Sequence, residues 1–261
     1  MNQPIKKKIG LALGGGVARG PIHIGVIAAL EKANIPIHCI AGTSAGALIG
    51  SLYCAGMPIE ELKAKGGILN WFDIARPVWS TTGFLSFARL EYLITTWIGN
   101  VNFDDLSIPF AAVATDVKRG EAVVLKEGHV ARAVRASCSV PGFITPVEIN
   151  GQFLGDGGVS NNLPVLAARQ LGADYVIGVD LFHSKGNLRW GLFSILSNVA
   201  ETMVRKSGNG FAIADYFISP DLSDYSYISL AKRAELIEVG EQVVMKHLHA
   251  IRESYDKFQV N

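Results

Sequence analysis

Residues 9–56 contain the same unit twice: a short apolar run, a turn of small residues, and an apolar stretch with helical spacing. The apolar runs are Ile9–Leu13 and Ile37–Ala41, and the helical stretches are Pro21–Lys32 and Ala45–Ala55, with Gly56 at the expected C-terminal cap. Runs that are apolar on both faces are typical of parallel strands covered by helices. The order strand, helix, strand, helix therefore predicts an α/β fold with a mainly parallel central sheet.

The rest of the chain continues this pattern with two interruptions. We predict strands, helices and a hairpin turning at Asn150-Gly151, in this order: Phe110–Thr115, Ala122–Leu125, Val130–Ala136 (helix), Val147–Leu154 (hairpin), Pro164–Leu171 (helix), Tyr175–Asp180, Phe211–Ile218 and Leu230–Tyr255 (helix). Residues 57–107, with short helices expected near residues 60–65 and 91–98, and residues 181–209 interrupt it. We expect residues 1–261 to form one domain with these two segments as inserted arms.

Composition narrows the class of protein. Hydrophobic residues make up 49% of the chain, charged residues 18%, and the formal net charge is +1, so no overall field would attract nucleic acid. Residues 33–59 contain no Asp, Glu, Lys or Arg, but two prolines and a Gly-Thr-Ser-Ala-Gly turn favour a buried strand, turn and helix over a membrane span. Three cysteines without CxxC spacing argue against zinc or disulfide scaffolds and favour a reducing, cytoplasmic compartment.

A serine stands in the turn between the second strand and the second helix. The segment Gly42-Thr43-Ser44-Ala45-Gly46 has the GxSxG spacing, in which small neighbours allow a sharp turn that presents the serine hydroxyl. The helix that begins at the next residue directs its positive dipole end at the same point. This context favours a nucleophile at Ser44 over an ordinary serine-glycine turn that caps a helix.

A serine nucleophile needs a base, and the chain offers two kinds. None of the six histidines lies in a glycine-framed polar loop; His23 falls within a helix pattern, and His183, which follows a strand end, is the best candidate among them. The other candidate is Asp156, in Gly155-Asp156-Gly157-Gly158, where glycines leave the carboxylate uncrowded. Burial would raise its pKa from about 3.9 toward the range that suits proton transfer.

The first glycine turn, Gly14-Gly15-Gly16-Val17-Ala18-Arg19-Gly20, can present backbone N–H groups to a ligand. It could cradle a dinucleotide pyrophosphate or form an oxyanion hole for a tetrahedral intermediate. The spacing departs from GxGxxG, and no acidic residue closes the second strand, which weakens the dinucleotide hypothesis. Loops at the carboxyl ends of parallel strands converge, so this turn and the Ser44 turn are expected to meet, which favours the oxyanion hole.

These stretches together resemble the patatin-like phospholipases, most closely the short bacterial members related to the catalytic domain of neuropathy target esterase. The matching segments, from Gly10 to about Asp180, are GLALGGGVARG, HIGVIAALE, AGTSAGAL, FAAVATDVKRGE, AVRASCSVPGFITPV and DGGVSNNLPV. The resemblance implies a three-layer α/β/α fold. It also implies a serine esterase or lipid acyl hydrolase of phospholipase or lysophospholipase type. Such an enzyme works through a Ser44–Asp156 dyad and an acyl-enzyme, without a catalytic histidine.

The resemblance assigns roles around the dyad as well. The amides of Gly14, Gly15 and Gly16 would hold the oxyanion, and Arg19 would support their loop. The glycines that would shape the two site turns are Gly42, Gly46, Gly157 and Gly158. Neither a metal nor a cofactor is implied. The expected partner is a lipid or other acyl ester, with at most transient contact with a membrane surface, and the oligomeric state stays open.

Several alternatives remain at this stage. Many relatives have a fourth glycine where Val17 stands, so which amides point inward is open. Asn161 and Asn162 are expected to hold the Asp156 loop. The tryptophan-rich segment from Trp71 to Trp97 suits an acyl-chain pocket, a lid facing a membrane, or a buried satellite core. For function, the alternatives are a Ser-His-Asp α/β-hydrolase and a catalytically silent regulatory protein on the same fold.

Overall fold

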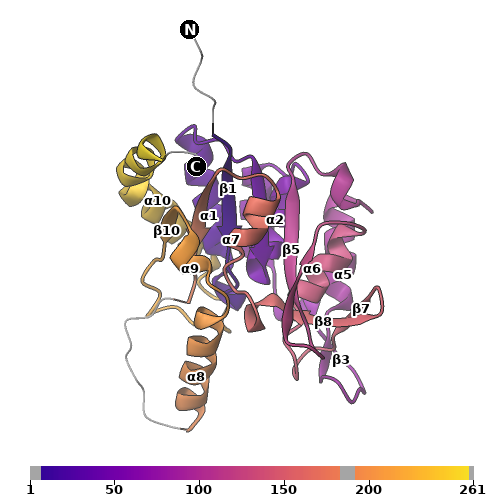
Figure 1. Cartoon of the computed structure of the whole chain (residues 1–261). Coiled ribbons are helices and arrows are strands. Elements are labelled where there is room, and N and C mark those ends of the chain that lie inside the picture. Colours follow the sequence, from indigo (N-terminus) through magenta and orange to yellow (C-terminus); the bar gives the residue numbers. More distant parts are fainter. Residues whose placement is uncertain (1–6, 183–191, 259–261) are drawn as a thin grey trace.

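The computed structural model describes residues 7–182 and 192–258. Its main sheet has eight strands in the order β10-β9-β1-β2-β5-β8-β7, with β6 paired to β5 (Figure 1). The strands are β1 Ile9–Leu13, β2 Cys39–Thr43, β5 Phe110–Asp116, β6 Glu121–Leu125, β7 Val147–Ile149, β8 Gln152–Asp156, β9 Tyr175–Val179 and β10 Tyr216–Ile218. Neighbours among β10, β9, β1, β2 and β5 pair in parallel, and β6, β7 and β8 pair antiparallel. The predicted mainly parallel α/β fold is confirmed.

Helices cover both faces of this sheet (Figure 1). The helices are α1 Pro21–Lys32, α2 Ala45–Cys54, α3 Ile59–Ile68, α4 Trp71–Ile74, α5 Ala88–Ile98, α6 Val130–Ser137, α7 Val165–Gln170, α8 Leu192–Lys206, α9 Gly210–Ile213 and α10 Arg233–Lys257. Helices α1, α2 and α10 pack on one face and α7 on the other. The first two predicted units therefore fold as expected, with β1 and α1 at the predicted bounds.

The two faces of the sheet carry side chains of different size, because alternate residues of a strand point to opposite sides. Toward α1, α2 and α10 the side chains are mostly large: Leu11, Leu13, Ile40, Phe110 and Ile177. Toward α7 they are smaller: Ala12, Cys39, Ala41, Ala111 and Val176. Helix α7 and its flanking loop consequently lie very close to the sheet, and a Cβ on Gly10 would come within 2.6 Å of the Ala173 Cβ.

One predicted strand was wrong in its first half. Residues 211–213 belong to α9, and the strand β10 begins only at Tyr216. The reason lies in two hydrogen bonds between Asp215 and Val176 of β9. The Asp215 N–H donates to the Val176 carbonyl, and the Asp215 carboxylate accepts from the Val176 N–H at 2.6 Å. These contacts fix the point at which the chain joins β9. The uncharged stretch of residues 33–59 folds as the expected buried strand, turn and helix, β2 and α2. In the described part of the chain, no helix combines the length and apolar character that crossing a bilayer requires.

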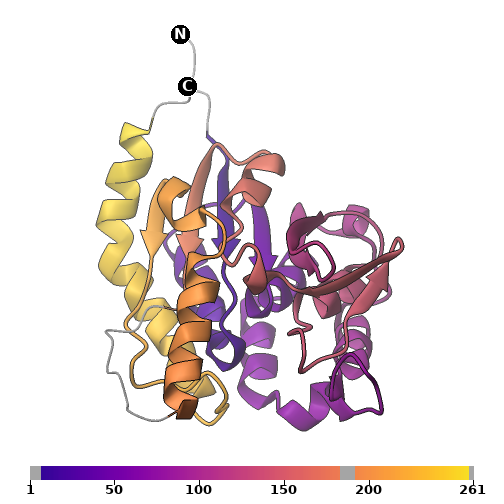
Figure 2. The same cartoon turned by 60° about the horizontal axis from the view of Figure 1, so that its bottom comes forward.

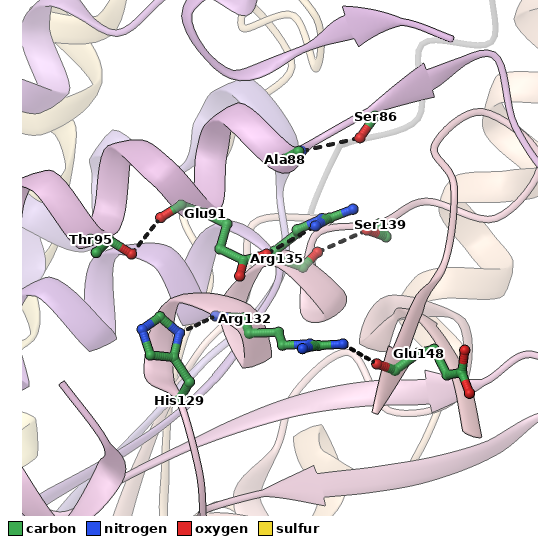
Figure 3. Close-up of polar contacts among 9 residues, drawn as sticks. All are labelled: Ser86, Ala88, Glu91, Thr95, His129, Arg132, Arg135, Ser139 and Glu148. Carbon is green, nitrogen blue, oxygen red and sulfur yellow. Dashed lines mark hydrogen bonds and ion pairs between the residues drawn. The ribbon is translucent and has the colours of Figure 1, made fainter. Parts of the chain in front are cut away.

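The segment 57–107 carries α3, α4, α5 and a hairpin of β3 Arg76–Pro77 and β4 Leu85–Ser86, which form a separate two-stranded sheet. Helix α5 packs on α6, and Figure 3 shows Arg135 of α6 directed at Glu91 of α5, with an N–O distance of 2.9 Å. Of the second predicted arm, residues 183–191 lie outside the described residues, and α8 follows them.

Candidate active site

Ser44 occupies a sharp turn between β2 and α2. Its backbone has φ 51° and ψ −118°, a conformation that costs a non-glycine residue energy and is typical of a nucleophile held on a strained turn. The turn closes only because Gly42 and Gly46, two residues before and after Ser44, lack side chains. A Cβ on Gly42 would lie 2.5 Å from the Gly46 carbonyl oxygen, and one on Gly46 would lie 2.1 Å from that of Leu13. The Ser44 N–H donates to the Ser137 hydroxyl at 2.8 Å, which fixes the turn against α6.

The pairing of β5 explains how Asp156 reaches Ser44. Strand β6 lies along one edge of β5, where it pairs with residues 112–116. On the opposite edge, Val113 pairs with Thr43 of β2, and the next residue, Ala114, pairs with Asp156 of β8. The end of β2 and the end of β8 therefore meet at consecutive positions of one strand edge. Ser44 follows Thr43 directly, so its turn leaves the sheet beside Asp156.

Asp156 is buried, and its carboxyl group accepts a hydrogen bond from the Gly158 N–H. Burial raises its pKa from 3.8 to about 6, while the neighbouring Ser44 hydroxyl and the Gly158 N–H act to lower it. The Gly158 N–H lies 2.8 Å from Oδ1, and the Asp156 N–H donates to the Ser139 carbonyl at 2.7 Å. The turn needs glycine here too, since a Cβ on Gly157 would lie 2.2 Å from the Val113 carbonyl oxygen. A buried carboxyl with this pKa can accept a proton from a hydroxyl near neutral pH.

The glycine loop after β1 lies against Ser44, and a Cβ on Gly15 would come within 3.4 Å of the Ser44 Cβ. Its amides differ in availability, which corrects the expectation that all three glycines face the site. The Gly14 N–H donates to the Val179 carbonyl at 2.9 Å, because it continues the pairing of β1 with β9. The Gly15 N–H donates to the Asn162 side chain at 3.1 Å. Among the described residues, the amides of Gly16 and Val17 have no acceptor, which leaves these two for a ligand.

His23 holds the same loop from the other side. It is fully buried in the first turn of α1, and its Nε2 lies 2.7 Å from the Gly14 carbonyl oxygen. Burial lowers its pKa from 6.5 to about 4, so the ring is neutral near pH 7 and donates through Nε2–H. The peptide that joins Gly14 to Gly15 is thus held at both ends, its carbonyl by His23 and its N–H by Asn162. This clamp sets the direction of the next peptide, which carries the Gly16 N–H.

Arg19 is buried and ties the glycine loop to two distant segments. Its guanidinium donates to the carbonyls of Leu181, Leu222 and Tyr225 and stacks on the Tyr227 ring, with its Cζ 3.5 Å from the ring centroid. These contacts of Arg19 are all to neighbouring segments of the fold, so its role in this arrangement is support. The Ala18 N–H also donates to the Tyr227 carbonyl, at 3.0 Å.

Comparison with known proteins identifies the family. The profile described as patatin-like phospholipase matches residues 11–169, which include Ser44, Asp156 and the glycine loop. The chain belongs to the patatin-like phospholipase family. Its sequence is 35% identical over 211 residues to an uncharacterised NTE family protein of Mycobacterium tuberculosis, which covers 79% of this chain and 58% of that protein.

Longer members of the family share this region as well. Identity is 35% with the neuropathy target esterase sws of Drosophila melanogaster, over 66% of this chain and 13% of that protein. It is 30% with the lysophospholipase NTE1 of Debaryomyces hansenii, over 90% of this chain and 17% of that protein. The chain therefore spans little more than half of the mycobacterial protein and a small part of the longer ones.

Two solved structures have the same fold. VipD from Legionella pneumophila superposes with a TM-score of 0.59 at 13% identity, over 94% of this chain and 67% of that one. ExoU, in its complex with SpcU from the Pseudomonas aeruginosa type III secretion system, gives 0.51 at 16% identity, over 94% and 52%. At these identities the likeness concerns the fold alone.

Four histidines of the described residues bond to groups other than Ser44 and Asp156. His23 bonds to Gly14, His38 to the Ile9 N–H, His129 to the Arg132 N–H and His247 to the Tyr216 hydroxyl. His183, the best histidine candidate for a base, lies outside the described residues. Within the described ranges, no three His, Cys, Asp or Glu side chains come together as metal ligands would.

Three side chains around Ser44 were not predicted to contact the site from the sequence. They are His23 on the Gly14 carbonyl, Ser137 on the Ser44 N–H, and Cys138, which is buried beside Ser44. Asn162 was expected to hold the Asp156 loop and instead bonds to the glycine loop. Their positions in the sequence were the signal that could have indicated these contacts. His23 is the third residue after Gly20, and Ser137 and Cys138 lie within one of the segments that carry the family resemblance.

Val17 has a backbone conformation that favours glycine. Its φ is 53°, a left-handed conformation that is strained for a β-branched residue, and its side chain is 39% exposed, so little burial compensates. We expect Val17→Gly to raise the free energy of unfolding by about 1 kcal/mol, because the relieved strain exceeds the added entropy of the unfolded chain. Urea denaturation measures this. The control Val159→Gly, at an exposed valine without positive φ, should destabilise, and equal destabilisation by both changes would contradict the strain.

Proposed function

We propose that this chain is a serine esterase that cleaves carboxylic esters of lipids through a Ser44–Asp156 dyad and an acyl-enzyme. One observation carries the proposal: the ends of β2 and β8 meet at Val113 and Ala114 of one edge of β5, which places the strained Ser44 turn beside Asp156, a buried carboxyl whose pKa is raised to about 6. A structural serine needs neither the strained backbone nor a base of this strength. The names of the relatives, neuropathy target esterase and lysophospholipase, support a lipid ester as the substrate class.

The chemistry follows from the two side chains. Ser44 Oγ attacks the ester carbonyl carbon while its proton passes to the Asp156 carboxylate, which gives a tetrahedral oxyanion. The bond from this carbon to the leaving alcohol oxygen then breaks, and Asp156 returns the proton to that oxygen. In the second half, Asp156 takes a proton from water, the resulting hydroxide attacks the acyl-enzyme carbonyl, and Ser44 leaves with the proton. Carboxyl and hydroxyl both end as they began.

Two backbone amides are placed to hold the oxyanion in this proposal. The N–H groups of Gly16 and Val17 follow the clamped peptide and have no acceptor among the described residues. The first turn of α2 adds its positive dipole end beside Ser44. Donors fixed in advance stabilise developing charge at no cost of reorganisation. The three cysteines are free and buried, which supports a reducing, cytoplasmic location.

A fluorophosphonate probe tests the nucleophile, because it forms a covalent bond only with an activated serine. Wild-type protein is expected to be labelled at Ser44, and Ser44→Ala to be unlabelled while keeping its thermal unfolding midpoint. Ser160→Ala is the matched control, since this hydroxyl bonds to Thr115 close to Asp156. Labelling of Ser44→Ala at the wild-type rate would overturn the proposal. An unreactive wild-type protein would favour the catalytically silent alternative.

A further inference from the structure

Three aromatic side chains protrude from the edge of the sheet at which the site lies. Trp79 is 106%, Phe84 73% and Phe143 67% exposed. Trp79 and Phe84 lie in the hairpin of β3 and β4, and Phe143 lies in the loop after α6. These three residues are called the aromatic surface below. Apolar groups of this size are normally buried, and grouped exposure marks an interaction site.

Backbone hydrogen bonds join the hairpin and the loop into one unit. The N–H groups of Phe84 and Leu85 both donate to the Phe143 carbonyl, at 2.9 and 3.0 Å, and the Val78 N–H donates to the Phe84 carbonyl at 3.1 Å. A Cβ on Gly83 would lie 2.7 Å from the backbone of Ile144, so hairpin and loop are in close contact. The three aromatic residues are therefore held at one place by the fold rather than exposed on independent loops.

The same unit is continuous with the site. The loop that carries Phe143 follows α6, whose last residue, Ser137, accepts a hydrogen bond from the Ser44 N–H. Ser139, near the start of this loop, accepts one from the Asp156 N–H through its carbonyl. The ion pair between Glu91 and Arg135 fixes the arm to the helix that ends there (Figure 3). In Figure 1 the hairpin, labelled at β3, lies near the lower end of the molecule, toward which β1 and its parallel neighbour β2 run, and Figure 2 turns this end forward. Whatever binds the aromatic surface is thus brought to the side on which Ser44 opens.

Charge and shape indicate the kind of partner. Residues 74–90 contain Arg76 and Arg89 and no Asp or Glu, and residues 138–147 contain no charged residue. Trp79 is fully exposed in the hairpin, so its indole is free to enter a soft, adaptable surface. Indole and phenyl rings beside arginine and without carboxylates suit the interface of a phospholipid bilayer with anionic headgroups.

We propose that the aromatic surface docks the chain on a phospholipid surface that contains anionic lipid, with Trp79, Phe84 and Phe143 entering the interface and Arg76 facing the headgroups. This inference rests on the proposed function in one respect: docking there presents Ser44 to lipid esters. A rigid hairpin placed in this way would bring the substrate to the site without any change of fold.

Co-sedimentation with vesicles tests the docking separately from catalysis. Ser44→Ala protein, which cannot hydrolyse the lipid, is mixed with vesicles of phosphatidylcholine, alone or with phosphatidylglycerol. We expect binding to the mixed vesicles. Replacing Trp79, Phe84 and Phe143 together by Ala in this protein should weaken binding about a hundred-fold, because three buried rings are lost. Arg76→Gln should weaken it about five-fold.

The matched control is Phe211→Ala, which removes an exposed ring from α9; it should leave binding unchanged. With Ser44 intact, the triple variant should hydrolyse a water-soluble p-nitrophenyl ester at the wild-type rate. No binding to either vesicle, or equal binding of the triple variant, would overturn the docking. A dimer by sedimentation velocity that the triple variant loses, without vesicle binding, would also overturn it and assign the surface to a second copy. Failure of wild-type turnover would count against the proposed function and leave the binding result valid.

Discussion

Asp156→Asn is expected to lower kcat/KM for a soluble p-nitrophenyl ester by about a thousand-fold, which is the usual contribution of a general base. The amide keeps the size of the side chain and can still bond to the Gly158 N–H, but it cannot take the Ser44 proton. The loss should appear in kcat with little change in KM, because the substrate still binds. Steady-state kinetics with wild type and variant measure both constants.

The pH profile tests the same residue independently. Since burial raises the pKa of Asp156 to about 6, kcat/KM of the wild type should rise with pH and reach half its plateau near pH 6. The free energy of unfolding should fall as the pH rises through the same range. Below pH 3.8 the carboxyl is protonated in both the folded and the unfolded chain. Above pH 6 the folded chain must bury a charge, at a cost of about 3 kcal/mol. Relative to Asp156→Asn, the wild type should lose unfolding free energy between pH 4 and 6 and no more above.

Two control variants accompany Asp156→Asn. Asp116→Asn changes another buried carboxylate, at the end of β5 and bonded to Gln152, and should leave kcat near the wild-type value. His183→Ala should also retain activity. A loss of several orders of magnitude at His183, with Asp156→Asn active, would replace the dyad by a Ser-His-Asp arrangement.

His23→Leu is expected to lower kcat about a hundred-fold with KM nearly unchanged. The Nε2–H of His23 fixes the Gly14 carbonyl, and Asn162 fixes the N–H of the same peptide, so the Gly16 amide has one direction. Leucine fills the space but leaves that carbonyl without its donor. The peptide can then rotate, and an oxyanion-hole donor that is misplaced loses much of its usual effect on kcat. His23 would be a positioning residue, since it acts through the loop and not on the substrate.

Rescue separates positioning from general packing. His23→Gln offers a side-chain N–H to the same carbonyl and should recover most of kcat. Because glutamine and leucine differ little in size, a difference in kcat between the two variants would report the hydrogen bond and not the packing. The control His38→Leu removes the contact of a histidine with the Ile9 N–H, at the other end of β1, and should cost stability without lowering kcat. Thermal unfolding of every variant shows whether the fold persists. If glutamine were as inactive as leucine at equal stability, the clamp would have no role in the rate.

Local patterns were sufficient for much of the fold. The bounds of β1 and α1 were predicted correctly, because an apolar run ended by glycines and a helix begun by proline leave few choices. The hairpin at Asn150-Gly151 formed as predicted, with φ values of 52° and 76°. The strand predicted from Phe211 failed, since its start is set by the contact of Asp215 with β9 and not by its own composition. Which glycine amides are free for a ligand also depended on residues distant in the sequence, because Val179 accepts from the Gly14 N–H and Asn162 from the Gly15 N–H.

The sequence alone determined the two turns that carry the proposed dyad, because GxSxG after a strand and GDGG after a hairpin leave the chain little freedom at Ser44 and Asp156. Only the tertiary structure decided that these turns meet. They lie far apart along the chain, and their contact depends on β2 leaving the edge of β5 at Val113 and β8 joining it at Ala114. A strand edge offers its hydrogen bonds to whichever segments the whole fold brings there, so no local pattern in either turn encodes the other. That shared edge is the physical reason why the hydroxyl and the carboxyl are neighbours.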